Sequence, residues 1–372
     1  MRRFLTVLLT LPLFAASLIT PATADTSIAI TEPTHRAVDG TYLDNELANS
    51  IAPGGRLGKI LFDRTSSATS YLIDIATLEE IQDLVDGYSY LDAAGETVEV
   101  PEFVIADIFL NTLKSAVKGK RIAVLPYGNP DRNFLEAKAP NEYDFLKQVA
   151  KERAFALFGT PVESVDSLGT GAKSYGAAKA LSNKYRKELR ALYAAAPASE
   201  TLSLRLKLGQ LLNPAVTKEL VLPLTQSTEK ALIENSKRLR VASGGYTITA
   251  SNYDLPVTVI NDFSLPATVE VRARPTNSRI VVGKIPVVTI PANSQSQVEI
   301  PLSIIASGET QLEVNLRTLK GRQVGAIEYV PLRLAVISPL TTWFTTGMAI
   351  ILLLAAVIQS VRRIRRRKKL QE

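Results

Sequence analysis

One apolar stretch, residues 340–361, restricts how the rest of the chain can fold. It runs from Leu340 to Val361 and contains no charged residue. At 1.5 Å rise per residue, about 20 such residues in a helix cross a hydrocarbon core of roughly 30 Å. The alternative is a buried core helix, but core helices seldom run this long without a charge. We therefore predict a transmembrane helix over residues 338–361.

The residues on either side of this stretch predict its orientation. Trp343 and Phe344 lie at one end, where amphipathic rings favour the headgroup layer. A cluster of cations follows the other end, and such a cluster resists translocation and marks the cytoplasmic side. We expect a basic cytoplasmic tail over residues 362–372 that also attracts anionic membrane lipid. Its cations are Arg362, Arg363, Arg365, Arg366, Arg367, Lys368 and Lys369.

The beginning of the chain predicts export. Arg2 and Arg3 precede an apolar run from Phe4 to Ile19, and the small residues at 22–24 resemble a signal-peptidase site. Residues 1–24 are therefore interpreted as a secretory signal that is cleaved after Ala24. An uncleaved N-terminal anchor is the alternative. Cleavage gives a single-pass protein of the cell membrane, with about 315 residues outside and the C-terminus in the cytoplasm.

The net charge of +7 does not indicate a nucleic-acid-binding protein. The signal carries two positive charges and the tail carries six net, so the segment between them has a net charge of −1. A nucleic-acid partner therefore loses its main support. The chain has no cysteine, which excludes disulfides, thiolate nucleophiles and cysteine-based zinc sites. We expect no cofactor and no metal site.

The exported part divides into three segments by pattern. Residues 25–160 alternate short apolar strands with helices, which predicts a small α/β domain, like part of a barrel, with parallel strands. Residues 161–241 contain helices with many Lys and Arg residues, interpreted as a helical connector with a solvated charged face. Residues 242–337 contain seven or eight short alternating runs, which predict an immunoglobulin-like antiparallel β-sandwich next to the membrane. The fold class is thus α+β and multidomain.

The strands predicted in the α/β domain are residues 27–31, 70–74 and 121–125, and the helices are 42–50, 56–62, 77–85, 103–117 and 141–158, with a polar loop ending at Pro101. The helices predicted in the connector are 177–196, 199–212 and 226–239. The strands predicted in the sandwich are 246–249, 256–260, 268–272, 279–282, 287–290, 297–304, 310–318 and 329–336.

Two carboxylates are candidates for chemistry. Asp74 and Asp131 each follow a predicted strand, where α/β folds place their sites, and a facing pair could serve glycoside hydrolysis. Each is also followed by a helix, and Asp is a preferred N-cap residue, so capping is the competing reading. Tyr127 could stack on a sugar ring in a weak glycan site with these two residues. Carboxyl groups about 5 to 9 Å apart in an open cleft would favour the enzyme, and burial at separate helix N-termini would favour capping.

The sequence lacks the residues or motifs that several other classes of enzyme require. His35 is the only histidine, so a metal-dependent deacetylase lacks clustered ligands, and we interpret His35 as a structural or surface residue. The segment 169–174 superficially resembles a phosphate loop, but its glycine spacing is wrong. Only three or four strands are readable in the α/β domain, too few for an eight-stranded barrel of about 250 residues.

Several fragments, in this order, resemble an actinobacterial family of uncharacterised single-pass envelope proteins, domain-of-unknown-function family 6049. The fragment 125–131 departs from the family pattern at Asn129, where the family has Asp, and Ile75 stands where the family often has Pro. Family members are commonly longer, so this copy looks abridged. The fragments are residues 32–36, 40–44, 54–57, 72–74, 125–131 and 256–262.

The resemblance implies a role in envelope biogenesis, because family genes often lie near the gene of the lipid II flippase. It implies no established activity that could be transferred. We therefore expect a non-enzymatic cell-envelope scaffold or interaction module, with the flippase, other wall-synthesis proteins or a glycan as possible partners. The alternative is a glycan-binding or glycoside-hydrolase-like protein that uses the carboxylates at strand ends.

Overall fold

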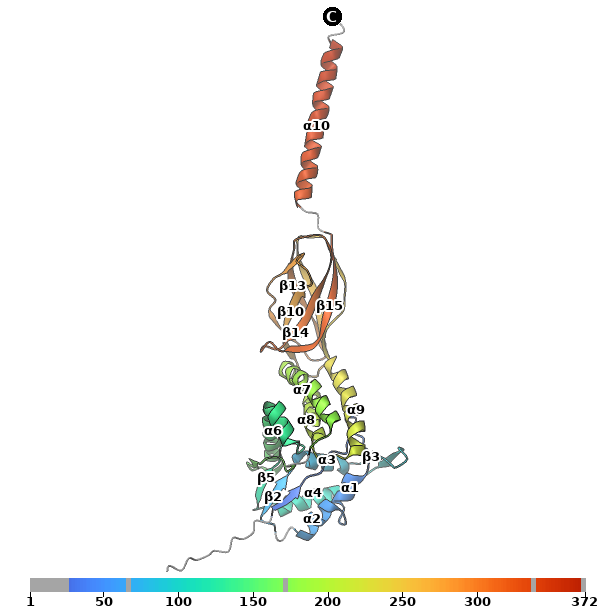
Figure 1. Ribbon diagram of the computed structural model, residues 1–372, viewed down its shortest axis with the longest axis vertical. Coiled ribbons are helices and arrows are strands. Elements are labelled where there is room, and N and C mark those ends of the chain that lie inside the picture. The colour runs from blue at the N-terminus through green and yellow to red at the C-terminus, as the bar shows by residue number, and fades with distance from the viewer. Residues whose placement is uncertain (1–26, 65–67, 170–172, 336–338, 369–372) are drawn as a thin grey trace, which may run out of the picture.

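The computed structural model describes residues 27–64, 68–169, 173–335 and 339–368. The predicted signal peptide, residues 1–24, lies outside the described residues. The chain is α+β and elongated (Figure 1), with an α/β part at one end, three long helices beside it, a β region beyond them and a single helix at the far end. The order of these parts along the sequence is therefore also their order in space.

The α/β part is built on a parallel sheet of four strands in the order β1-β2-β5-β6. Ile73 of β2 lies opposite Ile30 of β1 and Val124 of β5, and all three side chains are fully buried. The parallel pairing predicted from strand-helix alternation is confirmed. The elements are β1 (Ser27–Ile30), α1 (Glu46–Ile51), α2 (Arg56–Arg64), β2 (Ser70–Ile73), α3 (Ile75–Val85), β3 (Tyr88–Leu91), β4 (Thr97–Val100), α4 (Val104–Ala116), β5 (Arg121–Val124), α5 (Arg132–Lys138), α6 (Pro140–Phe158) and β6 (Glu163–Ser164).

Two predictions for this part were wrong. The expected polar loop before Pro101 contains the antiparallel hairpin β3–β4. The first helix was expected from Tyr42 but begins at Glu46, because the Tyr42 N–H donates to the carbonyl of Ser89 in that hairpin, at 2.9 Å. The helix α5 and the two-residue strand β6 were not anticipated either.

The three long helices are α7 (Gly176–Ala195), α8 (Ser199–Leu211) and α9 (Lys218–Ser236). The last of them begins earlier than predicted and contains Pro223 in its interior. The expectation of a solvated charged face is wrong for α8, because Arg205 and Lys207 are buried. Leucines of α8 and α9 belong to the same hydrophobic core as the parallel sheet, so this core continues past residue 160 into the helices.

The β region consists of two sheets that enclose one apolar core, in the orders β12-β10-β14-β15-β8 and β11-β13-β9-β7. All eight predicted strands are present, but β8 pairs with β15 in parallel, so the region is not purely antiparallel. The short β7 was not predicted, and the helix that was expected to end at Leu239 ends at Ser236. The strands are β7 (Leu239–Val241), β8 (Tyr246–Ile248), β9 (Asn252–Asn261), β10 (Ala267–Pro275), β11 (Ile280–Val282), β12 (Val287–Ile290), β13 (Ser294–Ile304), β14 (Gly308–Arg317) and β15 (Gln323–Leu334).

One helix, α7, contributes to both cores. Tyr185 and Leu189 pack with the α/β part, whereas Leu192 and Ala195 pack with the β region. A straight helix that is buried at both ends cannot turn relative to either core without exposing apolar surface. The α/β part and the β region are therefore joined by packed structure rather than by a linker.

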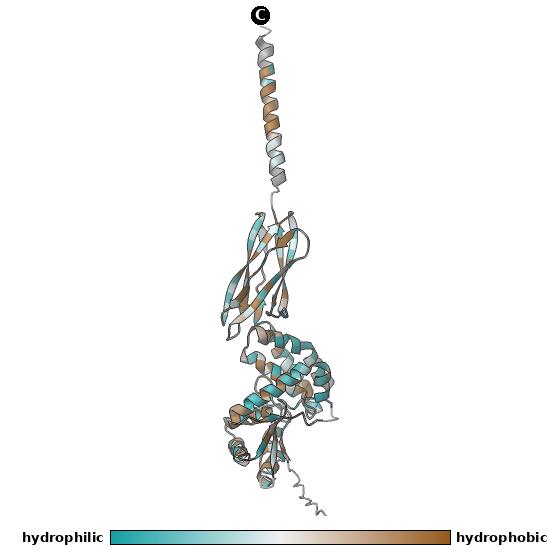
Figure 2. Ribbon diagram, turned by 90° about the vertical axis from the view of Figure 1, so that its left-hand side faces the viewer, coloured by the Kyte–Doolittle hydropathy of each residue, from teal (hydrophilic) through white to brown (hydrophobic). Residues whose placement is uncertain are grey.

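The final helix, α10 (Pro339–Lys368), carries an apolar band along its middle (Figure 2). Among the described helices it is the one that is long and apolar enough to cross a membrane, over Thr345–Arg362. The helix continues past residue 361, so most of the predicted tail is helical. Trp343 and Arg362 are exposed, and the side chain of Phe344 and those after Arg362 lie outside the described residues.

Candidate functional site

A cavity lies where the α/β part meets α8 and α9, and we call it the cleft. It has a volume of about 690 Å³. Helix α3 and the segment after β1 form one wall, and α8 with the end of α9 forms the other. The residues that line it are Arg36, Ala37, Val38, Glu79, Glu80, Asp83, Tyr127, Arg153, Glu200, Ser203, Leu204, Leu206, Lys207, Gln210, Ala231, Glu234, Asn235 and Arg238.

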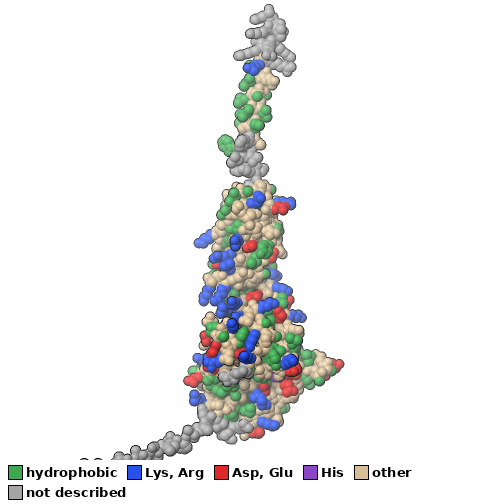
Figure 3. Space-filling view, viewed as in Figure 1, with side chains coloured by type: hydrophobic (Ala, Val, Ile, Leu, Met, Phe, Trp, Pro, Cys, Tyr) green, Lys and Arg blue, Asp and Glu red, His purple; other side chains and the backbone are tan. Residues whose placement is uncertain are grey.

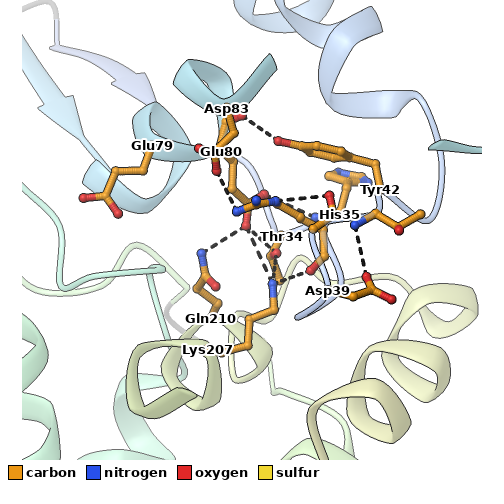
Figure 4. A network of polar contacts seen from close by, with 12 residues as sticks. Thr34, His35, Asp39, Tyr42, Glu79, Glu80, Asp83, Lys207 and Gln210 are labelled. Carbon is orange, nitrogen blue, oxygen red and sulfur yellow. Dashed lines mark hydrogen bonds and ion pairs between the residues drawn. The ribbon is translucent and has the colours of Figure 1, made fainter. Parts of the chain in front are cut away.

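A buried lysine connects the two walls of the cleft (Figure 4). Lys207 extends from α8, and its Nζ donates to Thr34 Oγ1 at 2.6 Å and to the carbonyl oxygen of Arg36. The same Nζ lies 3.8 Å from Glu80 Oε1 on α3. Burial lowers the pKa of Lys207 to about 8, because removal from water disfavours the charged form. Glu80 partly opposes this effect.

The carboxylate of Glu80 is the centre of the same network. Oε1 accepts from Thr34 Oγ1 at 2.5 Å and from Gln210 Nε2 at 3.1 Å, and Oε2 accepts from the His35 N–H at 3.4 Å. Charge-assisted hydrogen bonds of this kind offset the cost of burying a carboxylate. Residues from α3, from the segment after β1 and from α8 are thus held by one polar network beneath the cleft.

The charges around the rim of the cleft are paired. Arg36 Nη1 lies 2.6 Å from Asp83 Oδ2, and Arg238 Nη1 lies 3.1 Å from Glu200 Oε1. Charges of both signs line the cleft, so it does not favour a ligand of one strong charge. A ligand that fits it would combine polar groups with apolar surface.

Tyr127, the predicted stacking residue, does line the cleft, but its ring is largely covered. Its hydroxyl donates to Glu79 Oε2 at 2.7 Å, and the Arg153 guanidinium lies 5.1 Å from the ring centre. Arg153 also forms an ion pair with Glu79. Burial raises the pKa of Tyr127, and the neighbouring Glu79 raises it further. The geometry fixes Tyr127 as part of the wall instead of offering an open ring face.

Asp74 is fully buried and is the N-cap of α3. Its Oδ1 accepts from the Ala76 N–H at 3.1 Å and from the Gly128 N–H at 3.0 Å. Among the described residues its Oδ2 has no hydrogen-bond partner. Burial raises the pKa of Asp74 to about 7, although the two backbone N–H groups lower it. Asp74 thus fixes the turn at residues 126–130 to the start of α3.

Asp131 is the N-cap of α5 and is also buried. Oδ1 accepts from the Phe134 N–H at 3.0 Å, while Oδ2 accepts from the N–H and hydroxyl of Ser174, each at 3.2 Å. Burial alone would raise the pKa of Asp131, but these hydrogen bonds and Lys179 outweigh it, so the pKa is lowered. The capping reading is confirmed for both carboxylates, which are buried at separate helix N-termini.

His35 is a buried structural residue. Its Nδ1 lies 2.8 Å from Asp44 Oδ1. Burial by itself lowers the pKa of His35, but Asp44 outweighs this effect and the net pKa is raised. Within the described ranges no group of three or more His, Asp or Glu side chains could hold a metal ion.

The residues of α8 that line the cleft, among them Lys207 and Gln210, were not predicted from the sequence. A signal for them was present, because Leu204, Leu206 and Leu208 alternate with polar residues along the helix. On a helix this spacing places apolar side chains on several faces, which is typical of a helix surrounded by protein. Polar residues between such leucines are then buried too.

Comparisons with known proteins identify a family but no activity. Residues 164–371 match the model described as "Family of unknown function (DUF6049)". A comparison with curated proteins gives no match. Among solved structures, the secreted serine protease VesC from Vibrio cholerae is similar with 10% identity and a TM-score of 0.21, over 26% of this chain and 23% of the protease. The chain thus spans under a quarter of that protein.

Two further structures show similar values. WR4, a C. elegans MSP family member, is 14% identical with a TM-score of 0.21, over 26% of this chain and 98% of its own. PapD-like domain 7 of human CEP192 is 9% identical with a TM-score of 0.21. The match covers 27% of this chain and 87% of the CEP192 domain. TM-scores of this size carry no argument about the fold or function of this chain.

Proposed function

Because the chain belongs to family DUF6049, whose function is unknown, we propose a role from its geometry. It is a non-enzymatic, single-pass scaffold of the cell envelope that binds a partner in the cleft. The observation that carries this proposal is the cleft itself, a cavity of about 690 Å³ with paired charges at its rim and a buried polar network beneath it. A cavity of this size, lined by apolar residues such as Leu204 and Leu206 together with a few polar groups, suits the binding of a ligand.

The proposed topology has α10 in the cell membrane and the cleft outside it. The apolar segment Thr345–Arg362 supports a membrane span, and the cations that follow support a cytoplasmic C-terminus. Each cation close to the inner surface contributes about 1 kcal/mol of attraction to anionic lipid. The α/β part then lies at the end of the chain furthest from the bilayer, as Figure 1 shows for α10 and the sheet β1-β2-β5-β6.

In this proposal the β region is an immunoglobulin-like stalk. Its two sheets enclose one core, and α7 packs into both this core and that of the α/β part. A stalk joined in this way separates the cleft from the membrane. The partner is a protein or glycan of the cell wall, with the lipid II flippase and other wall-synthesis proteins as the first candidates.

A glycoside hydrolase is the weaker proposal. The pair Asp74 and Asp131 would have to face a substrate, but both side chains are buried and accept hydrogen bonds from helix N-termini. Neither residue lines the cleft, so neither carboxyl group could reach a substrate bound there. Tyr127 is covered by Arg153, which also weakens the proposal of a stacked sugar.

Site-specific photocrosslinking in intact membranes tests the proposed function. The photoreactive amino acid replaces Ser203, an exposed residue of the cleft, or Asp107, an exposed residue of α4 outside it. We expect the Ser203 position to crosslink one envelope protein or glycan that the Asp107 position does not. Equal crosslinking from both positions, or none from Ser203, would contradict a partner in the cleft.

A further inference from the structure

A second hollow lies at the junction of α7 with the β region. Its volume is about 480 Å³, and it lies between one side of α7 and the turn that connects β14 to β15. Helix α7 contributes Lys184, Lys187, Glu188 and Arg190, and the turn contributes Arg322. Lys and Arg side chains gather on the surface where the helices meet the β region (Figure 3). Four of the eight residues that line the hollow are therefore cations.

Most of these positive charges are not neutralised. Lys184 Nζ pairs with Glu229 Oε1 at 2.8 Å. In the described part of the chain, Lys187, Arg190 and Arg322 have no carboxylate within ion-pair distance. These three cations share the hollow with one carboxylate, that of Glu188, so positive charge is in excess there, and an anion that enters reduces the repulsion between the cations.

Arg190 gives an independent indication of a missing partner. Its Nε is inaccessible to solvent and, among the described residues, has no hydrogen-bond partner. Buried polar atoms in folded proteins are nearly always hydrogen-bonded, and an exception calls for an ion or another bound group. Burial, and then the positive charge of Arg322, lower the pKa of Arg190. An oxyanion in the hollow would offset the repulsion between Arg190 and Arg322.

We propose that this hollow binds a phosphate group. Phosphate carries up to two negative charges and several acceptor oxygens, which match the three cations Arg190, Lys187 and Arg322 that line the hollow. A single carboxylate would neutralise only one of the three cations. Glu188 also lines the hollow, and burial raises its pKa.

The phosphate does not come from the bilayer that anchors the chain. Strand β15 begins at Gln323 beside the hollow and ends at Leu334, shortly before α10. Its 12 residues span roughly 40 Å at about 3.3 Å per residue. Headgroups next to α10 are thus too far away, and the ligand is a small phosphate or a phosphate-bearing polymer outside the membrane. This inference is independent of the partner in the cleft.

Titration with inorganic phosphate tests the proposal on the full chain. The protein is held in maltoside micelles, which contain no phosphate, and binding is followed by ³¹P line broadening at low ionic strength. Arg322→Gln and Lys187→Gln should each weaken binding about tenfold, the usual loss of one charge-assisted contact. Arg333→Gln removes an exposed charge elsewhere in the β region and should leave the affinity within about twofold.

Two outcomes would overturn the proposal. One is an adventitious ion only, seen as no saturable binding or as equal affinity in the Arg322→Gln and Arg333→Gln variants. The other concerns the source of the phosphate. The full chain in phosphatidylcholine nanodiscs should not sediment with phosphatidylglycerol vesicles in a manner that depends on Arg322. If it did, the site would bind lipid headgroups.

Discussion

Lys207 Nζ on α8 lies 3.8 Å from Glu80 Oε1 on α3, and both side chains are almost completely buried. This pair joins the long helices to the α/β part beneath the cleft. The cleft therefore depends on a contact between residues far apart in the sequence, and removal of either charge should loosen the whole site.

Lys207→Met tests this contact at pH 7, where a lysine with a pKa of about 8 is charged. The substitution leaves the Glu80 carboxylate buried without its cation, which typically costs about 3 to 5 kcal/mol of unfolding free energy. The double variant with Glu80→Gln should recover part of this loss, because no buried charge is left unpaired. Pulse proteolysis in urea on the full chain in micelles measures both values. Strict additivity of the two substitutions would argue against the pair.

The buried pair of Glu142 on α6 and Arg205 on α8 should contribute about as much to the free energy of unfolding as the pair of Lys207 and Glu80. Two hydrogen bonds join the side chains, one of them 2.9 Å from Nη2 to Oε2, and the guanidinium lies 3.3 Å from the centre of the Phe145 ring. Arg205→Met should lower the free energy of unfolding by about 3 to 5 kcal/mol. Lys237→Met is the control, since it breaks an exposed pair worth less than about 1 kcal/mol. If Arg205→Met and Lys237→Met lowered the free energy of unfolding by similar amounts, Arg205 of α8 would not be buried against Glu142 of α6.

The raised pKa of Asp74 predicts that the stability of the protein depends on pH. Its folded-state pKa of about 7 lies above the ordinary value of 3.8, so the folded chain binds more protons than the unfolded chain between these values. The free energy of unfolding should therefore fall as the pH rises from about 4 to 7, by up to about 4 kcal/mol. Asp74→Asn cannot titrate and should lack this part of the fall. Urea unfolding at several pH values decides the matter, and parallel curves for the two proteins would refute the assignment.

A substitution of Gly128 tests the contact between α8 and the turn at residues 126–130. Its φ is +78°, and an added Cβ would lie 2.8 Å from Gln210 Cα. Gly128→Ala should cost about 1 to 2 kcal/mol for the left-handed backbone, and more for the clash with a helix backbone. Gly119→Ala is the matched control, because φ is +70° there but no atom lies within 4 Å of the added Cβ. The difference in unfolding free energy between the two variants isolates the contact, and equal losses would exclude it.

Local patterns in the sequence predicted much of this fold. Alternation of apolar residues located all eight predicted strands of the β region, and the uncharged run after Leu340 located α10. Capping chemistry also predicted the roles of Asp74 and Asp131, because an Asp between a strand and a helix serves the free N–H groups of that helix. These features depend on neighbours in the sequence, which a pattern can reveal.

The cleft could not be predicted in the same way, because it depends on tertiary contacts. The charges of Arg205 and Lys207 favoured a solvated helix face, but partners on α6 and α3 allow them to be buried. The sequence of α8 alone does not predict that Glu142 and Glu80 are those partners. The start of α9 was missed for a different reason, since Pro223 argues locally against a helix that tertiary packing nevertheless stabilises.

Cysteine labelling tests the central claim, a cleft held outside the membrane by α10, most directly. The chain has no native cysteine, so a single one can be placed at Ser203 in the cleft or added after Glu372. A membrane-impermeant maleimide applied to intact cells should label the Ser203→Cys protein and leave the C-terminal cysteine unlabelled until the cells are broken. Labelling of the C-terminal cysteine on intact cells, with protection of Ser203→Cys, would contradict the account.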